Sequence, residues 1–355
     1  MRAAIAAITL LAAGCARNLP APRTPLGRAA AFLWSQQAAD GAWHSRTYGL
    51  LRSGQSLTPF VLRALLEVPA DAYPSQPARV DRALAFIAHK TRADGALGLA
   101  DSIPDYPNYS TALAVLAICK ARRPGWEAQA RRMTDYLRTQ QFTEQNGWMH
   151  DQPAYGAWGM GGERRTPPDT GHVDLSMTRY VLQALRGAGI RVTDPLFEKA
   201  GVFVSRCQVG GGDGGLFFST TEADINKAGM DGSHFRSYGT ATADGILAML
   251  AMEVPETDER IRSAEQWMRR NHRDNLVPGF AGDAYQRWPQ GLSFYYAAAS
   301  AEALHALAID LGSGAQEALK ASQRADGSWA NPENLVKEDD PLIATPFAIR
   351  ALIGK

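Results

Sequence analysis

The chain has 355 residues, of which 45% are hydrophobic and 21% charged, and its 37 Lys and Arg nearly balance 36 Asp and Glu. The resulting net charge of +1 argues against a dedicated nucleic-acid-binding protein, which carries a concentrated basic excess. The hydrophobic content and eight Trp exclude a disordered chain, and three Cys are too few for a disulfide scaffold of this size. The composition therefore predicts a globular protein.

The first residues are typical of an export signal. Arg2 precedes an apolar run that ends at Gly14 and is too short to cross a bilayer. Residues 12–15, Ala-Ala-Gly-Cys, resemble a bacterial lipobox, although that pattern prefers leucine where Ala12 stands. We expect residues 1–15 to be a lipoprotein-type signal peptide ending at Cys15, which is lipidated. A plainly cleaved signal and a first structural helix are the alternatives.

Residues 16–26 contain three prolines and no apolar periodicity, which predicts an extended tether. Together with an acylated Cys15, this tether would hold residues 27–355 beside a membrane. The expected location is the periplasmic side of a bacterial membrane, and the outer membrane is favoured if the host is Gram-negative. The expected partners are therefore the membrane, through the lipid anchor, and an isoprenoid, another lipid or a peptide as ligand, and no nucleic acid.

A helical stretch followed by a glutamine and a Gly-x-aromatic turn recurs along the chain. The two strongest copies share the spacing Gln-x-x-x-Gly-x-Trp and consist of Gln37, Gly41 and Trp43, and of Gln323, Gly327 and Trp329. Weaker copies end at residues 94–97, 147–148, 214–217 and 278–280. Six turns of one kind predict a repeated supersecondary unit.

A second pattern alternates with the first: a Thr or Ser, an aliphatic residue four positions on, and another three further. Offsets of three and four place these side chains on one face of a helix. The leading residues are Thr58, Thr111, Thr178, Thr242, Ser300 and Thr345. Each follows one Gly-aromatic turn, so the unit is an outer helix, a turn and an inner helix, and six units predict twelve helices.

The Gln-Gly-Trp motif resembles the QW motif of squalene-hopene and oxidosqualene cyclases. Six such hairpins are similar to the α/α toroid of the terpenoid cyclase and protein prenyltransferase superfamily. The resemblance implies a single all-α (α/α)6 toroid over residues 27–355, with six inner helices around a funnel and six outer helices. It also implies that the glutamine binds the backbone of a neighbouring helix end while the tryptophan packs over the glycine turn. Class II cyclases have two such barrels, for which this chain is too short.

The chemistry of those cyclases requires an acid that this sequence lacks at the matching position. They protonate an alkene with the middle acid of an Asp-x-Asp-Asp-Thr motif at the start of an inner helix. When its Thr is matched to Thr178, Asp174 is the first Asp but Ser176 takes the place of the acid. The same position in the other repeats holds Ser56, Tyr109, Thr240, Ala298 and Ile343. A serine cannot protonate an alkene, so we expect no cyclisation by this mechanism.

Protein prenyltransferases hold zinc through Asp, Cys and His at inner-helix ends. The sequence contains no Asp-x-Cys, and neither Cys119 nor Cys207 precedes an inner helix. We therefore expect no metal and no cofactor.

Polar and aromatic residues gather near the predicted inner-helix N-termini, where they would rim or line one mouth of the funnel. They are Tyr48, Asp105, Tyr106, Tyr109, His172, Asp174, His234, Arg236, Tyr238, Asp244, Tyr295 and Tyr296. Asp174 is either a helix N-cap or an acid, and His172 either a loop residue or a general base. Asp244 lies inside a helix, where a cap does not explain it, and is the strongest candidate acid.

Three functions are compatible with these patterns. The first is a membrane-tethered toroid whose apolar funnel binds an isoprenoid, another lipid or a peptide without turning it over. The second is an enzyme of the cyclase or prenyltransferase type in which Asp174 or Asp244 takes a relocated acid role. The third is a structural or interaction toroid whose small residues at 297–299 close the centre. A continuous apolar pocket is required by the first two and excluded by the third.

Overall fold

The computed structural model describes residues 22–209, 212–221 and 224–354. The expected signal peptide, Cys15 and most of the expected tether lie outside the described residues. None of the helices that the described ranges contain has the length and apolar character needed to cross a bilayer.

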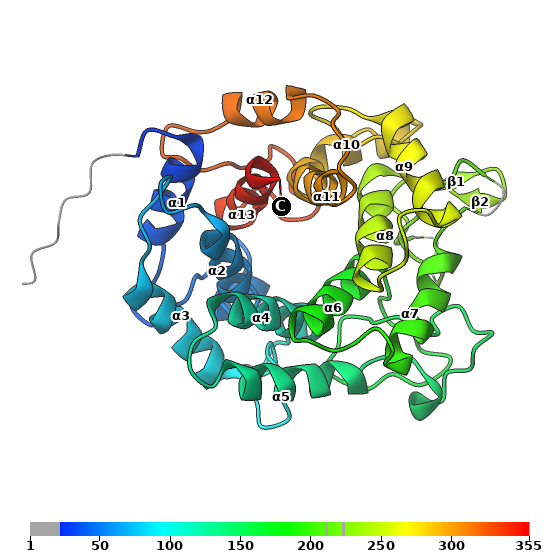
Figure 1. The fold of residues 1–355 in the computed structure, drawn as a ribbon, viewed down its shortest axis with the longest axis horizontal. Coiled ribbons are helices and arrows are strands. Elements are labelled where there is room, and N and C mark those ends of the chain that lie inside the picture. Colours follow the sequence, from blue (N-terminus) through cyan, green and yellow to red (C-terminus); the bar gives the residue numbers. More distant parts are fainter. Residues whose placement is uncertain (1–21, 210–211, 222–223, 355) are drawn as a thin grey trace, which may run out of the picture.

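The helices form two concentric rings (Figure 1). The inner ring consists of α2 (Leu57–Glu67), α4 (Pro107–Ala121), α6 (Leu175–Gly187), α8 (Gly239–Ala251), α11 (Ser293–Ala306) and α13 (Pro341–Ile353). The outer ring consists of α1 (Pro25–Ser35), α3 (Pro77–Lys90), α5 (Trp126–Thr139), α7 (Pro195–Arg206), α9 (Glu259–Asn271) and α12 (Gly314–Ala321). Each inner helix packs on the next, and α13 packs on α2, which closes the ring. The predicted all-α (α/α)6 toroid is confirmed.

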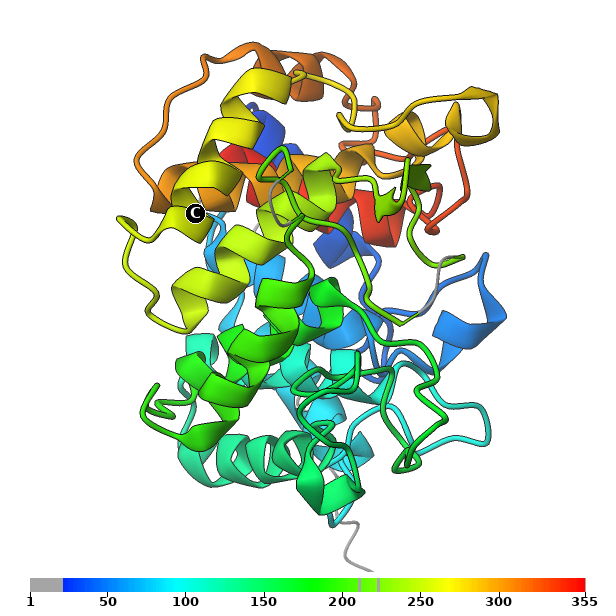
Figure 2. The same cartoon turned by 90° about the vertical axis from the view of Figure 1, so that its right-hand side faces the viewer.

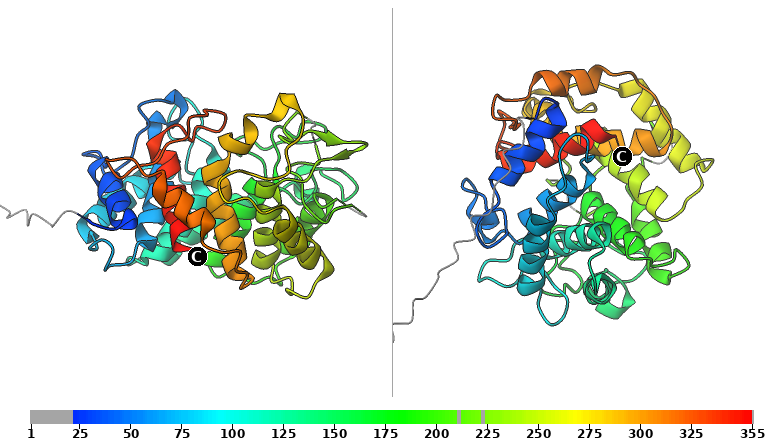
Figure 3. Two further views of the ribbon diagram at one scale, coloured as in Figure 1. Left: turned by 90° about the horizontal axis from the view of Figure 1, so that it is seen from above. Right: turned by 60° about the vertical axis from the view of Figure 1, so that its left-hand side comes forward.

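The outer helices cover the joints of the inner ring. Helix α3 contacts both α2 and α4, and α1 contacts both α13 and α2, so one outer helix spans the junction between the chain ends. Figure 3 shows the same two layers from other directions, with α12 in orange covering α13 in red. The apolar faces of both rings share one continuous core.

The connections between the helices divide the toroid into two unlike faces. Long connections run from each outer helix to the next inner helix and lie together on one face, to the right in Figure 2. They contain the minor elements η1 (Gly49–Ser53), η2 (Glu144–Asn146), η3 (Asp283–Tyr285), α10 (Trp288–Gly291), β1 (Met230–Asp231) and β2 (His234–Phe235). The two strands pair antiparallel, with Met230 opposite Phe235. The inner helices thus begin on the face that carries the long loops.

Helix α1 begins at Pro25, two residues before the expected start of the toroid at residue 27. The side chain of Thr24 accepts a hydrogen bond from the Gly27 amide at 3.0 Å, and Pro25 occupies the first turn. A capping hydroxyl followed by proline is a strong helix start, because proline has no amide hydrogen to leave unpaired. Residues 25 and 26 therefore belong to the toroid.

The glutamine of the first turn connects two repeats. Gln37 Nε2 donates to the carbonyls of Gly41 and Arg79, both at 2.9 Å, and Arg79 lies in the first turn of the next outer helix. Trp43 is completely buried, and its Nε1 donates to the carbonyl of Leu33 at 2.7 Å. The turn, the helix before it and the next outer helix are thereby held in one geometry.

The last turn makes the same contacts across the chain termini. Gln323 Nε2 donates to the carbonyls of Gly327 and Pro25, both at 2.9 Å. Trp329 Nε1 donates to Leu319 at 2.8 Å. Because Pro25 begins α1, this glutamine links the last repeat to the first.

The threonines of the second pattern anchor each turn to its own inner helix. In five repeats the threonine Oγ1 accepts a hydrogen bond from the backbone amide at the Trp position of the turn, at 2.9–3.3 Å. The donor and acceptor pairs are Trp43 and Thr58, Leu97 and Thr111, Trp158 and Thr178, Leu216 and Thr242, and Trp329 and Thr345. The pattern therefore fixes the start of each of these inner helices.

The expectation that residues 147–148 form the third turn is wrong. Gln141 donates to the carbonyls of Gly156 and Leu196, and it is Trp158 whose Nε1 donates to Leu137 at 2.7 Å. Residues 142–155 are inserted between the glutamine and its glycine. The Gly-Trp pair of this insertion matches the motif in sequence alone, since the Trp148 indole bonds elsewhere.

Three glycine substitutions distinguish the cost of a positive φ from the cost of a steric clash with the added Cβ. Gly41 has φ +90°, and a Cβ there would lie 2.6 Å from the Arg82 carbonyl oxygen. We predict that Gly41→Ala lowers the free energy of unfolding by roughly 2–4 kcal/mol, from backbone strain and overpacking together. Gly189→Ala has the positive φ but open space and should cost about 1 kcal/mol. Gly49→Ala has neither feature. Urea denaturation tests this order, and equal losses for Gly41 and Gly189 would contradict it.

Candidate functional site

A cavity of about 250 Å³ opens among the N-terminal ends of the inner helices. Its walls are mostly apolar. The aromatic wall residues are Phe60, Tyr106, Tyr109, Phe218, Tyr238, Tyr295 and Phe347. The polar wall residues are Ser56, His172, Asp174, Ser176, Lys227, Thr240, Lys337 and Glu338. The cavity contradicts the third alternative, a toroid whose centre is closed, because the alanines at 297–299 do not fill it.

Charged side chains fill the axis of the toroid beyond the cavity. Arg179 on α6 contacts the Asp244 carboxylate on α8 through Nε and a terminal nitrogen, both at 3.0 Å. Glu302 on α11 bonds to Arg350 on α13, and Arg350 Nε lies 3.5 Å from Glu67 on α2. We call the residues Arg63, Glu67, Arg179, Asp244, Glu302 and Arg350 the charge plug. It carries three positive and three negative groups and makes the cavity blind.

Tyr295 separates the cavity from the charge plug. Its hydroxyl lies 2.7 and 2.8 Å from the two carboxylate oxygens of Asp244 and 2.9 Å from Ser176 Oγ, while its ring lines the cavity. Burial raises the pKa of Asp244 to about 6, and the ion pair with Arg179 and the Tyr295 hydrogen bond oppose this rise. The predicted acid Asp244 is thus brought beneath the cavity, where Tyr295 covers it.

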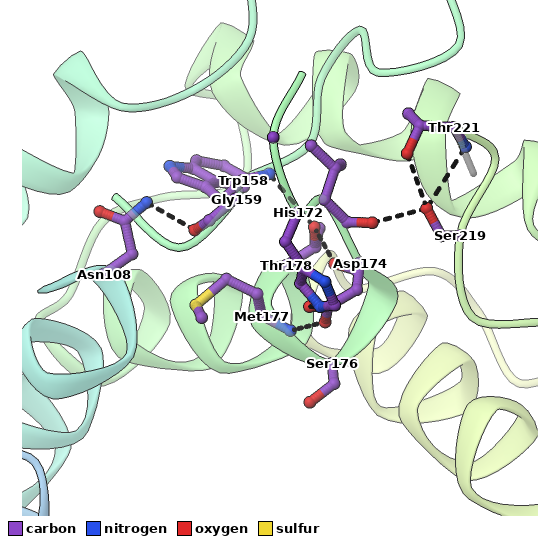
Figure 4. A network of polar contacts seen from close by, with 12 residues as sticks. Asn108, Trp158, Gly159, His172, Asp174, Ser176, Met177, Thr178, Ser219 and Thr221 are labelled. Carbon is purple, nitrogen blue, oxygen red and sulfur yellow. Dashed lines mark hydrogen bonds and ion pairs between the residues drawn. The ribbon is translucent and has the colours of Figure 1, made fainter. Parts of the chain in front are cut away.

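Asp174 and His172 lie together at the cavity wall (Figure 4). Asp174 caps α6 by accepting a hydrogen bond from the Met177 amide at 2.7 Å, and its other oxygen lies 2.9 Å from His172 Nε2. Asp174 is therefore a helix cap that also faces the pocket. Ser176, at the position of the cyclase acid, also lines the wall.

Lys227 gives the apolar wall an ammonium group. Its Nζ lies 3.2 Å from the centre of the Phe218 ring, and within the described part of the chain it has no hydrogen-bond or ion-pair partner. Burial lowers the pKa of Lys227 to about 8, although the charges of Asp174 and Asp244 act in the opposite direction. An ammonium at an apolar wall without a counter-ion is a site for a negatively charged group.

The loop before α13 supplies two further charged groups. Lys337 Nζ donates to the Tyr106 hydroxyl at 3.2 Å. Glu338 is fully buried and accepts hydrogen bonds from the amides of Phe294 and Tyr295 at 3.0 and 2.8 Å and from Asn331 Nδ2 at 2.9 Å. Burial raises the pKa of Glu338 to about 7. Its three donors make it the anchor that holds this loop against the start of α11.

Several predicted site residues lie outside the cavity wall. Tyr48 donates to Asp339 at the edge of the mouth. Asp105 is buried and accepts hydrogen bonds from the hydroxyl of Ser53 and the amide of Ser56, so it joins two loops. His234 and Arg236 lie on and beside β2, away from the wall, and Arg236 pairs with Asp231 at 3.2 Å.

Tyr296 is buried but faces away from the cavity and packs toward Gly239 and Pro278. Adjacent residues of a helix point about 100° apart, so Tyr295 and Tyr296 cannot both face the axis. Of the predicted tyrosines, Tyr106, Tyr109, Tyr238 and Tyr295 line the wall. Among the described residues, no cluster of three His, Cys, Asp or Glu is placed to hold a metal ion.

These features define an α/α toroid with one blind apolar cavity and charged groups at its mouth. No family model and no curated protein matches the sequence. Solved structures with the same fold include the type II terpene cyclase MstE from Scytonema, at 12% identity and TM-score 0.59, covering 93% of this chain and 96% of that one. MstE has also been solved with geranylgeranyl dihydroxybenzoate, its substrate, at 13% identity and TM-score 0.58, covering 93% and 94%.

The fold is also shared with carbohydrate-binding proteins. A variant of a protein titled UGL, solved with the saccharide dGlcA-Glc-Rha-Glc, is 14% identical with TM-score 0.61 and covers 92% of this chain and 94% of that one. Identities this low show a common fold, and the fold is found with different chemistries.

The charge plug generates a stability prediction. Arg179→Met would leave the buried Asp244 without its ion partner, so we expect the free energy of unfolding to fall by about 3–5 kcal/mol near neutral pH. The loss should be smaller at about pH 5, where the carboxyl is protonated and no longer needs the arginine. Arg186 lies on α6 like Arg179, and Arg186→Met, which breaks its exposed pair with Glu253, should cost about 1 kcal/mol or less. Chemical denaturation at both pH values checks this, and a pH-independent loss would contradict it.

Proposed function

We propose that the protein binds one isoprenoid or similar lipid chain that carries an anionic group, and holds it without cyclising it. This proposal rests on the blind apolar cavity and on Lys227 in its wall. An apolar chain gains free energy by leaving water for such a cavity. A peptide is a poorer occupant, because its backbone amides would leave water for walls that offer them few partners.

The anionic group follows from the charges of the mouth. Lys227 has an aromatic ring but no counter-ion among the described residues, and Lys337 is bonded to a neutral tyrosine. A carboxylate or phosphate beside Lys227 would supply the missing partner and restore the full charge of the ammonium. The MstE substrate, geranylgeranyl dihydroxybenzoate, likewise combines a prenyl chain with an acidic group.

Binding without cyclisation is supported by the state of the acids. The position of the cyclase acid is Ser176, and both carboxylate oxygens of Asp174 are engaged, one by His172 and the other by a helix amide. Asp244 is paired with Arg179 and covered by Tyr295. None of these groups is the neutral, strong acid that an alkene requires.

The proposal includes the membrane. If Cys15 is acylated, residues 16–24 are the connection between the lipid anchor and α1, and the toroid would receive its ligand from the bilayer surface. Recovery of the ligand unchanged from the purified protein supports binding, and conversion of the ligand would favour the enzymatic alternative.

Two ligands with one chain test the role of Lys227. We predict that the protein binds farnesoic acid about tenfold or more tightly than farnesol near neutral pH, because only the acid forms the ion pair. Lys227→Met should remove that preference and leave farnesol binding in place. Lys320→Met, on the exposed side of α12, is the matched control and should change neither affinity. Isothermal titration calorimetry measures these affinities.

The preference should also depend on pH. Raising the pH from neutral to about 9.5 removes the proton of Lys227, whose pKa in the empty cavity is about 8, so the affinity for farnesoate should fall while that for farnesol stays constant. The Lys227→Met variant should lack this dependence. Equal affinities for the two ligands in the unchanged protein would contradict the anion site, and no binding of either would contradict the proposed function.

A further inference from the structure

A second cavity of about 210 Å³ lies beside the first and differs from it in character. His172 and Met160 belong to the walls of both, so the two cavities are neighbours across these side chains. The wall of the second cavity is polar and includes Gln140, Arg164 and Thr170. It is built by the long connection between α5 and α6, which contains the insertion at residues 142–155.

Two asparagines in this wall have buried acceptor oxygens without a partner among the described residues. Asn146 Nδ2 donates to the carbonyls of Thr139 and Gln141 at 3.2 and 2.7 Å, which fixes the orientation of its amide and leaves Oδ1 unpaired. Asn108 Nδ2 donates to the Gly159 carbonyl at 2.8 Å, and its Oδ1 is also unpaired. The two residues are 6% and 1% exposed.

Unpaired buried acceptors indicate what kind of group the second cavity accepts. Such an oxygen needs a donor, and hydroxyl groups supply donors without bringing charge. Phosphate or carboxylate oxygens would meet the two acceptors with repulsion. The same wall also holds Glu163 beside Arg164 and Arg165, so it offers a charged acceptor and charged donors together, and a group that both donates and accepts suits it better than an ammonium group. A hydroxyl-rich group such as a sugar fits all of these side chains, because arginine also donates to hydroxyl oxygens.

Lys227 lies near the wall that the two cavities share, because Phe218 contacts both Lys227 and His172. The Phe218 ring contacts Lys227 on one side and lies edge-on to His172, with ring centres 6.0 Å apart. A ligand whose anionic group lies beside Lys227 therefore reaches the shared wall at His172. If the ligand continues past His172, its next part enters the second cavity.

We propose that the second cavity binds the sugar or polyol head group of the same ligand, so that the natural ligand is a glycosylated lipid. The apolar chain occupies the first cavity, and the hydroxyl groups bond to Asn146 and Asn108 in the second. This inference rests on the proposed function, since the chain must enter the first cavity for the head group to reach the second.

A pair of uncharged ligands isolates the contribution of the sugar. Farnesol and farnesyl β-D-glucoside share one chain, and we expect the glucoside to bind about tenfold more tightly. Thr170→Phe, which fills the second cavity from its loop, should reduce the affinity for the glucoside to that for farnesol and leave farnesol binding intact. Thr193→Phe, on an exposed loop elsewhere, is the matched control and should change neither.

Asn146→Leu tests the acceptor directly and should also abolish the preference for the glucoside. Because Asn146→Leu removes two hydrogen bonds of the loop, its folding is checked by circular dichroism. If this variant does not fold, the Thr170→Phe result alone tests the inference. The inference is overturned if the unchanged protein binds the glucoside no more tightly than farnesol, or if Thr170→Phe weakens both ligands equally. If farnesol itself does not bind, the proposed function fails first and the inference falls with it.

Discussion

The ring depends on a hydrogen bond between residues near opposite ends of the chain. Gln323 donates to the carbonyl of Pro25, and this places the last turn against the first outer helix, as Gln37 places the first turn against the second. Without closure, α13 and α2 would expose the faces that they bury against each other. The cavity lies inside this ring, so the wall positions on the inner helices take their geometry from the same repeated turn. The motif that is most distinctive in the sequence therefore builds the site and takes no part in its chemistry.

The axis of the toroid is divided into two environments by one layer of side chains. Toward the long loops it is an apolar cavity, and beyond Tyr295 it is filled by the charge plug. Buried charges are tolerated there because each lies within ion-pair distance of an opposite charge. Arg63 pairs with Glu67 on the same helix, and the other pairs join five of the six inner helices. Because Asp244 is paired with Arg179 and covered by Tyr295, it does not line the cavity. A blind cavity whose acids are all engaged favours retention of a ligand over its protonation.

Periodicity in the sequence predicted the toroid, its two rings and the registers of its inner helices. The offsets of three and four residues along the inner helices are recognisable even in repeats whose turns match the motif poorly. The register at Thr178 aligned Asp174 and Ser176 with the cyclase motif, and both residues line the cavity. It could not separate Tyr295 from Tyr296, since both are near a helix start and only the rotation of the helix decides which faces inward. Lys227, Lys337 and Glu338 were missed altogether. They lie on connections without any period, and their place in the wall arises from loop packing that no local pattern records.

We propose that the first cavity holds a lipid chain with its anionic group beside Lys227. The most direct test is a crystal structure of the protein with farnesoic acid. The account predicts electron density for the chain between Phe60, Phe347 and Leu113, with the carboxylate within ion-pair distance of Lys227 Nζ. Density for the ligand elsewhere on the protein, or an empty cavity at a saturating ligand concentration, would contradict it.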